Sequence, residues 1–254
     1  MCLKLIHYHL FLDDVGQFAL SQIINWQPCS IIMIFSKKIL ARVSKLDIPS
    51  AKNFVTLEQK VRGVEELFGQ LEKETAQFQQ KSGLGCVSGC GKCCNYAQIE
   101  ASPLEFLPWA FHLFLKGEAE TTLDALGENQ NPTCFLFAPL SVVNQGHCGT
   151  YPYRGLICRL FGFAATRDKY GSLRLATCKI IKEGQAEQYR SVSEAIAQGL
   201  YVPVFTDYYM QLKQIDHLLG NKMMPVNKAL KMALEEVLQY YTYRPIPDAG
   251  KWCV

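Results

Sequence analysis

The sequence is organised around the stretch Cys86-Val-Ser-Gly-Cys90-Gly-Lys-Cys93-Cys94, in which four thiols fall within nine residues. A thiolate is a soft ligand that suits zinc, copper(I) and iron–sulfur clusters. The spacings Cys86-x3-Cys90 and Cys90-x2-Cys93 allow one tight turn to aim several sulfurs at a common centre. Glycine permits positive φ angles and close backbone approach, and four glycines accompany the thiols: Gly83, Gly85, Gly89 and Gly91. The stretch therefore predicts a loop that binds a metal ion or cluster.

The adjacent pair Cys93-Cys94 is compatible with two arrangements. Neighbouring side chains of an extended segment point in opposite directions. The two sulfurs then serve different centres, or the backbone is bent and they share one. The sequence leaves both arrangements open.

A second group of thiols follows, interleaved with aromatic and basic residues: Cys134, Cys148, Cys158 and Cys178. Four thiolates around a divalent metal leave a net charge of about −2, which nearby cations offset while donating hydrogen bonds to sulfur. The basic residues next to or near the thiols are Lys92, Arg154, Arg159 and Lys179. His147 precedes Cys148 and could replace a thiolate as ligand, although a single histidine beside a cysteine is more often incidental.

This pattern resembles the YkgJ-type cysteine-cluster family. The motifs are Cys86-x3-Cys90-x2-Cys93-Cys94, then Cys134-Phe-Leu, then Cys148-x2-Tyr151-x2-Arg154-x3-Cys158-Arg159, then Cys178. The family is described as a zinc- or iron-chelating domain with eight cysteines, and the resemblance covers roughly residues 84–182. It implies metal ligation by all eight: Cys86, Cys90, Cys93, Cys94, Cys134, Cys148, Cys158 and Cys178.

The resemblance also implies that Tyr151, Arg154 and Arg159 surround the ligands. Tyr151 and Arg154 would orient ligands or bind a substrate anion, and the simpler alternative is that they brace the turn between two ligands. Gly155 departs from the pattern, because the family usually has proline after the arginine. Without proline the φ angle is no longer fixed, so we expect a less rigid turn.

Two other interpretations use the same cysteines. A disulfide framework requires an oxidising compartment, and the chain carries no convincing export signal. Radical S-adenosylmethionine enzymes use Cys-x3-Cys-x2-Cys to hold a four-iron cluster. Three features argue against that class here. Little strand–helix alternation follows Cys93, no glycine-rich cofactor segment follows a clear strand, and Lys92 stands where those enzymes usually carry an aromatic residue. An iron–sulfur cluster without that chemistry remains open. Cys2, Cys29 and Cys253 lie outside the motifs and are expected to be ordinary buried thiols.

Three classes of function follow from these motifs. The first is a structural or carrier protein that binds zinc or iron. The second is an iron–sulfur-dependent enzyme, such as a transferase or a radical S-adenosylmethionine-like enzyme. The third is an interaction module that a metal stabilises. No serine elbow, paired-carboxylate site or phosphate loop stands out, so catalytic residues are not assigned and enzymatic activity is left open.

Composition and hydropathy limit which partners and which cellular compartment fit these functions. The chain has 254 residues and a formal charge of +3 without a long basic run, which argues against nucleic-acid binding. The apolar runs Leu3–Leu12 and Ile23–Phe35 are shorter than the roughly 18–20 residues that a membrane span needs. Eleven cysteines without a secretion signal indicate a reducing cytoplasm with metal-bound thiols. Residues 1–50 form an uncertain N-terminal extension, and we hypothesise that translation begins at Met33.

An amphipathic helix is expected within residues 51–83. Thr56-x-x-Gln59 matches a capping box, and Ser82-Gly83 would end the helix. Apolar positions recur in alternating steps of four and three: Leu57, Val61, Val64, Phe68, Leu71, Thr75 and Phe78. This seam fits packing against the helix's own domain, and a homodimer through residues 57–78 is the alternative.

The rest of the chain predicts helices around the cysteine region. Ser102-Pro103-x-Glu105 is a helix start, and residues 160–166 and 172–177 could pair as a hairpin that presents Cys158 and Cys178 at its open end. Residues 84–182 form the cysteine-cluster domain, and residues 183–254 are a helical segment packed on it. The predicted fold is mostly α with a small β-hairpin, a cysteine-rich metal-binding core wrapped by helices.

Overall fold

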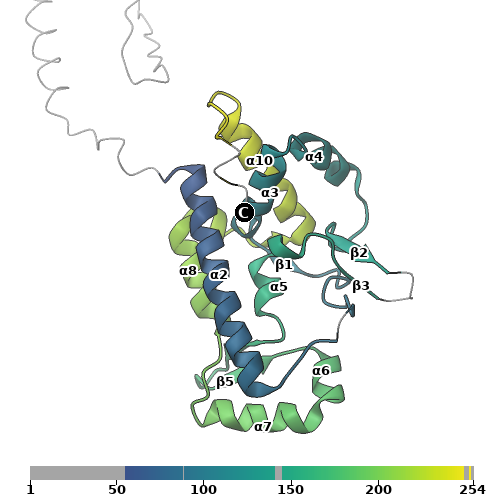
Figure 1. The fold of residues 1–254 in the computed structure, drawn as a ribbon, viewed down its shortest axis with the longest axis vertical. Coiled ribbons are helices and arrows are strands. Elements are labelled where there is room, and N and C mark those ends of the chain that lie inside the picture. The colour runs from purple at the N-terminus through teal and green to yellow at the C-terminus, as the bar shows by residue number, and fades with distance from the viewer. Residues whose placement is uncertain (1–54, 88, 141–144, 249–251, 253–254) are drawn as a thin grey trace, which may run out of the picture. The chain divides into compact units, whose positions relative to one another are not determined.

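The structure is a computed structural model that describes residues 55–87, 89–140, 145–248 and 252 (Figure 1). Residues 55–254 form one compact unit. The expectations for the extension 1–50, for the Met33 start and for Cys2, Cys29 and Cys253 lie outside the described residues. Among the helices that the structure describes, none combines the length and the apolar character needed to cross a membrane.

The first described helix, α2 (Leu57–Ser82), begins and ends where the sequence predicts. Thr56 and Gln59 form the capping box, with the Thr56 backbone N–H donating to Gln59 Oε1 at 2.8 Å and the Gln59 N–H donating to Thr56 Oγ1 at 3.2 Å. Gly83 adopts the left-handed conformation at φ 67° and ends the helix. Since few other residues tolerate that φ, Gly83 also sets the direction in which the chain leaves toward Cys86.

The predicted seam of α2 packs against the helix's own chain. All of its positions are at most 8 % exposed: Leu57, Val61, Val64, Phe68, Leu71, Thr75 and Phe78. Most of them join the main core, which α2 shares with α3 (Leu107–Leu115), α8 (Phe205–Ile215) and α10 (Val226–Tyr241). The seam is therefore occupied within one chain, and a homodimer would need a different face of α2.

Shorter elements complete the helical frame. They are η2 (Pro103–Phe106), α4 (Ala119–Glu128), η3 (Tyr151–Tyr153), α5 (Leu156–Leu160), α6 (Lys179–Gly184), α7 (Ala186–Ala197) and α9 (His217–Gly220). A small core lies beside the C-terminal end of α2, where Phe78 and Leu84 pack with apolar side chains of α6, α7 and the neighbouring hairpin. Figure 1 shows α7 running across this end of α2. The mostly α prediction is confirmed.

Three two-stranded antiparallel sheets connect the helices in the described part of the chain. They pair β1 (Glu100–Ala101) with β6 (Met224–Pro225), β2 (Phe137–Pro139) with β3 (Gly146–Cys148), and β4 (Ala164–Arg167) with β5 (Leu173–Ala176). The last pair is the predicted hairpin. It is shorter than expected, because α5 extends through Leu160 and a turn with Gly162 at φ 98° precedes the strand.

Glu105 is a buried carboxylate that caps two helices. Its Oε1 accepts hydrogen bonds from the Ser102 backbone N–H at 2.8 Å and from Ser102 Oγ at 3.1 Å, so Ser102 and Glu105 start η2 as predicted. Its Oε2 accepts from the Ile157 N–H at 3.2 Å, at the beginning of α5. Burial raises the pKa of Glu105 from 4.5 to about 6. One side chain therefore joins η2 to the helix that carries Cys158.

Glu105 makes stability depend on pH in a defined direction. Because its pKa is higher in the folded state, folding binds a proton between pH 6 and 4.5, and the free energy of unfolding rises as pH falls through this window. The shift from 4.5 to about 6 corresponds to about 2 kcal/mol. Chemical unfolding of wild type and Glu105→Gln at several pH values should show the advantage of wild type growing by about this amount from pH 7 to pH 4.5. A constant difference would contradict this role.

Candidate metal centre

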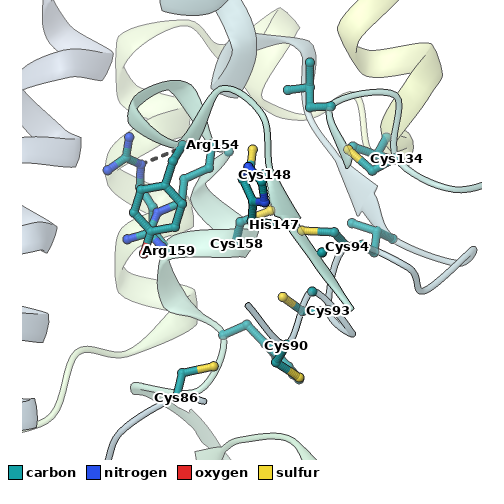
Figure 2. A pocket seen from close by; sticks show the side chains of 18 of the residues that line it. Cys86, Cys90, Cys93, Cys94, Cys134, His147, Cys148, Arg154, Cys158 and Arg159 are labelled. Atoms are coloured by element: carbon teal, nitrogen blue, oxygen red, sulfur yellow. Dashed lines mark hydrogen bonds between the residues drawn. The ribbon is translucent and has the colours of Figure 1, made fainter. Parts of the chain in front are cut away.

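Seven of the eight predicted ligands line one cavity of about 520 Å³ (Figure 2). They come from separate segments of the chain: Cys86, Cys90, Cys93, Cys94, Cys134, Cys148 and Cys158. Cys178 is not part of this lining, but it interacts electrostatically with Cys86. All eight thiols are free. Among the described residues, no three His, Cys, Asp or Glu side chains converge closely enough to hold one ion, so the thiols share a cavity wall and do not yet form a closed coordination sphere.

The loop that carries the first four thiols is bent. The Cys90 N–H donates to the Val87 carbonyl at 3.3 Å, and the N–H groups of Cys94 and Asn95 donate to the Gly91 carbonyl at 3.0 and 3.1 Å. Cys93 and Cys94 therefore lie in a turn and not in an extended segment, and each thiol shifts the pKa of the other. Of the two arrangements that the sequence left open, the backbone is the bent one.

Two glycines let this loop approach the β2–β3 hairpin. Gly91 has φ 57°, and a Cβ added to it would lie 2.6 Å from the Gly146 carbonyl oxygen. A Cβ at Gly146 would lie 2.7 Å from the Ala138 carbonyl oxygen. The close approach allows the Gly146 N–H to donate to the Gly89 carbonyl at 3.0 Å. Glycine at these positions thus brings the first group of thiols against the strand that carries Cys148.

The β2–β3 hairpin positions Cys134 and Cys148. Phe137 pairs with Cys148 in the register of the hairpin, and the Phe137 N–H donates to the Cys134 carbonyl at 2.9 Å. Asn227 of α10 holds both sides of Cys134, because its Nδ2 donates to the Thr133 carbonyl at 2.9 Å and its Oδ1 accepts from the Phe135 N–H at 2.8 Å. The backbone around Cys134 is therefore fixed by a helix almost 100 residues further along the chain.

Cys158 lies on α5, and Gly155 is the N-cap residue of that helix. Gly155 has φ −65°, an angle that proline would also adopt. A Cβ here, however, would lie 2.9 Å from the Phe106 ring and 3.0 Å from Glu105 Oε2. The departure from the family pattern at Gly155 thus has a steric reason in this chain, and the turn is held by Glu105 without the help of a proline ring.

Cys178 immediately precedes α6, and a glutamine at the end of that helix reaches the first loop. Gln185 Nε2 donates to the Gly85 carbonyl at 2.7 Å, and the Gly85 N–H donates to Gln185 Oε1 at 3.1 Å. This two-way contact fixes the residue before Cys86. The hairpin β4–β5 forms as predicted, but the thiol that interacts with Cys178 comes from the loop after α2.

The thiols strongly influence one another's ionisation. Burial raises the pKa of Cys134 to about 11 and also raises the pKa values of Cys158 and Cys86, with repulsion from neighbouring thiolates adding to each. The Cys94 thiol donates a hydrogen bond to Cys93, which lowers the pKa of Cys93 and raises that of Cys94. Burial and mutual repulsion therefore disfavour the thiolate forms of Cys86, Cys134 and Cys158.

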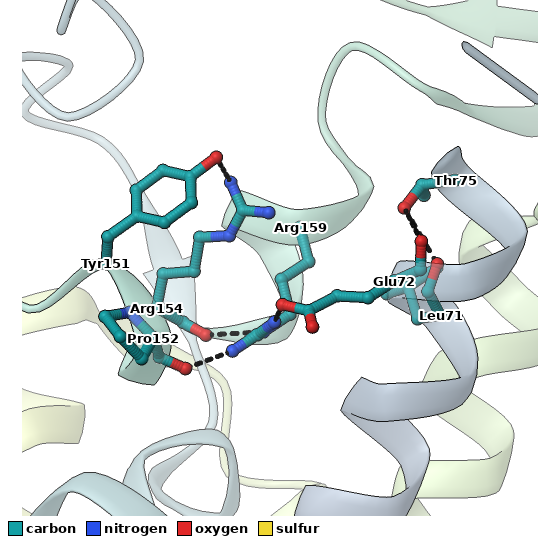
Figure 3. A network of polar contacts seen from close by, with 7 residues as sticks. All are labelled: Leu71, Glu72, Thr75, Tyr151, Pro152, Arg154 and Arg159. Carbon is teal, nitrogen blue, oxygen red and sulfur yellow. Dashed lines mark hydrogen bonds and ion pairs between the residues drawn. The ribbon is translucent and has the colours of Figure 1, made fainter. Parts of the chain in front are cut away.

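Arg159 links the turn that precedes Cys158 to helix α2 (Figure 3). It is 4 % exposed and contacts Glu72 of α2, the Pro152 carbonyl and, at 2.9 Å, the Arg154 carbonyl. Its guanidinium also lies 4.3 Å from the centre of the Phe68 ring. These contacts tie the turn between Cys148 and Cys158 to α2, a role that was considered from the sequence for Tyr151 and Arg154 and not for Arg159.

Arg154 and Tyr151 face the cavity from the same turn. Arg154 Nη1 donates to the Tyr151 hydroxyl at 2.5 Å, and the guanidinium lies 4.1 Å from the ring centre. Arg154 Nε is buried and has no hydrogen-bond partner. His147 also lines the cavity, whereas Lys179 pairs with Glu183 at 3.5 Å on the surface. Of the predicted cations, Arg154 and Arg159 both line the cavity, and Arg154 has the donor without a partner.

Sequence reasoning did not identify the three polar residues that position the thiols: Glu105 as a contact of α5, Gln185 and Asn227. Nothing in their sequence neighbourhood marks these roles, since each acts on a segment at least 50 residues away. For Glu105 the capping motif with Ser102 was visible, but its second contact was not.

Comparison with known proteins adds no relative: no family model, no curated protein and no solved structure matches the chain. The resemblance to the YkgJ-type family stays a prediction that depends on the motifs alone.

Gly91→Ala should separate the first loop from the hairpin. Its Cβ would meet the Gly146 carbonyl and would also disfavour the positive φ, so we expect the free energy of unfolding to fall by about 1–3 kcal/mol. Gly85→Ala is the matched control, because nothing lies within 4 Å of the added Cβ and its φ is not positive. Chemical unfolding measures both, and equal effects would contradict the close-approach argument.

Glu72→Ala should destabilise the protein although Glu72 lies at the surface. It leaves the buried Arg159 guanidinium without its anion, and we expect a loss of about 2–3 kcal/mol. Glu66→Ala on the same helix serves as the control, with a change within about 0.5 kcal/mol. Adding Arg159→Met to Glu72→Ala should recover part of the loss, because the unpaired charge is then gone. A Glu72→Ala effect as small as that of Glu66→Ala would show that the pair is unimportant.

Proposed function

We propose that this protein binds zinc or iron through its eight cysteines, as a structural or carrier metal-binding protein. The observation that carries the proposal is the meeting of seven thiols from distant segments around one cavity. Soft sulfur donors suit zinc and iron. The wall also holds the imidazole of His147 and the guanidinium groups of Arg154 and Arg159, which fit such a site.

Electrostatics supports the same proposal. Burial and mutual repulsion raise the pKa values of Cys86, Cys134 and Cys158. Thiolates gathered in this way need a positive charge, and a bound metal ion supplies it while displacing the thiol protons. Arg154 interacts favourably with the Cys93 thiolate and would hold that ligand in place. In this proposal the ion draws the thiolates in from the cavity wall, so that binding and folding are coupled.

An iron–sulfur-dependent enzyme is the second candidate. A cavity of about 520 Å³ is larger than a bare ion needs, since zinc–sulfur bonds are only about 2.3 Å long. The unpaired Nε of Arg154 is a donor in this wall that an anionic group could use. The cytoplasm is the compartment we propose for either function, because it keeps thiols reduced and available to metal.

Metal and sulfide analysis after anaerobic purification tests the proposal. Zinc without colour would favour the structural or carrier function, and iron with acid-labile sulfide and a brown chromophore would favour the enzyme. Cys90→Ser should lose metal and stability, because it removes a ligand. The matched control replaces the three cysteines outside the motifs, Cys2, Cys29 and Cys253, with serine and should keep the full metal content. Wild-type protein without zinc or iron, or a Cys90→Ser variant with unchanged metal content, would contradict the proposal.

A further inference from the structure

The thiols of the second group in the sequence pack against two different parts of the protein. Cys134 and Cys148 lie against the main core, and α5 inserts Leu156 and Leu160 into that core on either side of Cys158. Cys178 lies instead against the small core. Figure 2 shows the same spread within the cavity, with Cys86 and Cys90 toward one end and Cys134 and Cys148 toward the other.

The Coulomb interactions between thiols follow the same division. Cys158 interacts with Cys134, Cys148 and Cys93, and Cys94 interacts with Cys148 and Cys158. Cys86 interacts with Cys90, Cys93 and Cys178. Cys93 is the thiol that the two groups have in common. The turn Cys93-Cys94 therefore lies where the groups meet.

Each group has its own amide side chain that ties its backbone segments together. Gln185 lies at the end of the helix that Cys178 precedes. Its amide nitrogen and oxygen both hydrogen-bond to the backbone of Gly85, the residue before Cys86. Asn227 grips the residues on either side of Cys134. Each contact fixes the backbone next to a predicted ligand.

From this arrangement we infer that the thiols form two separate four-thiolate centres, Cys94/Cys134/Cys148/Cys158 and Cys86/Cys90/Cys93/Cys178, held by Asn227 and Gln185 respectively. This inference rests on the proposed function. Four thiolates complete the coordination of one zinc ion or one four-iron cluster, so eight thiols fill two such centres. Cys93 completes the second centre, because the first already has four ligands without it. The bent turn at Cys93-Cys94 then joins two adjacent centres, which differs from the sequence expectation that a bent backbone brings both thiols to one centre.

Anaerobic reconstitution with Zn²⁺ alone tests the division. Wild type should bind two equivalents of zinc by native mass spectrometry. Cys134→Ser and Cys178→Ser should each keep about half of the zinc, and the double variant should keep none. Far-UV circular dichroism identifies a variant that fails to fold, and the wild-type stoichiometry then still decides the number of centres.

The amide residues give a second and independent readout. In the Cys134→Ser background, Gln185→Ala should accelerate zinc release to a chelator about tenfold, the size of effect typical of residues that support metal ligands. In the Cys178→Ser background it should have no effect, and Asn227→Ala should show the reverse pattern. Gln198→Ala and Asn221→Ala are surface amide controls that should leave both rates unchanged.

The outcomes separate this inference from the proposed function. If wild type binds a single equivalent, or if Cys134→Ser and Cys178→Ser each lose all zinc while folded, one shared centre exists and the division is wrong, although the metal-binding proposal stands. If Gln185→Ala acts equally in both backgrounds, its assignment to one centre is wrong. If wild type binds no zinc and, in the analysis above, no iron, both proposals fail together.

Discussion

The burial of one face of α2 is the interaction on which the rest of the structure depends. Along its length the helix contributes Leu57 to Leu71 to the main core and Phe78 to the small core, so it joins the two parts of the protein. Between these regions Glu72 pairs with the buried Arg159, which anchors the turn leading to Cys158. The helix then ends at Gly83 and directs the chain into the cysteine loop. A single apolar seam therefore both builds the core and places the first thiols.

Among the described residues of the loop 86–94, none belongs to either apolar core, and the loop is held by backbone contacts. Gly91 and Gly146 allow the loop and the hairpin to touch, and the polar side chains of Glu105, Gln185 and Asn227 bind backbone groups next to predicted ligands. Such contacts fix where the backbone lies next to the predicted ligands, as the proposed metal site requires.

Much of the frame could be predicted from local patterns. The capping boxes at Thr56 and Ser102, the apolar seam of α2 and the hairpin β4–β5 depend on residues close together in the sequence, and each appears in the structure. Contacts between distant segments could not be predicted. The position of Cys178 beside Cys86 depends on how α6 packs on the small core, and the exclusion of a larger residue at Gly155 depends on Phe106 and Glu105.

The sequence by itself determined the chemical character of the site, because thiol spacing and soft-donor chemistry are local properties. It also determined the helices, whose apolar periodicity and caps are local as well. Only the tertiary structure decided which thiols are neighbours, which cation faces them and which amides hold their backbone. These features depend on the packing of helices and hairpins that are far apart in the chain. The energy of that packing depends on several segments together, so no single stretch of sequence determines it.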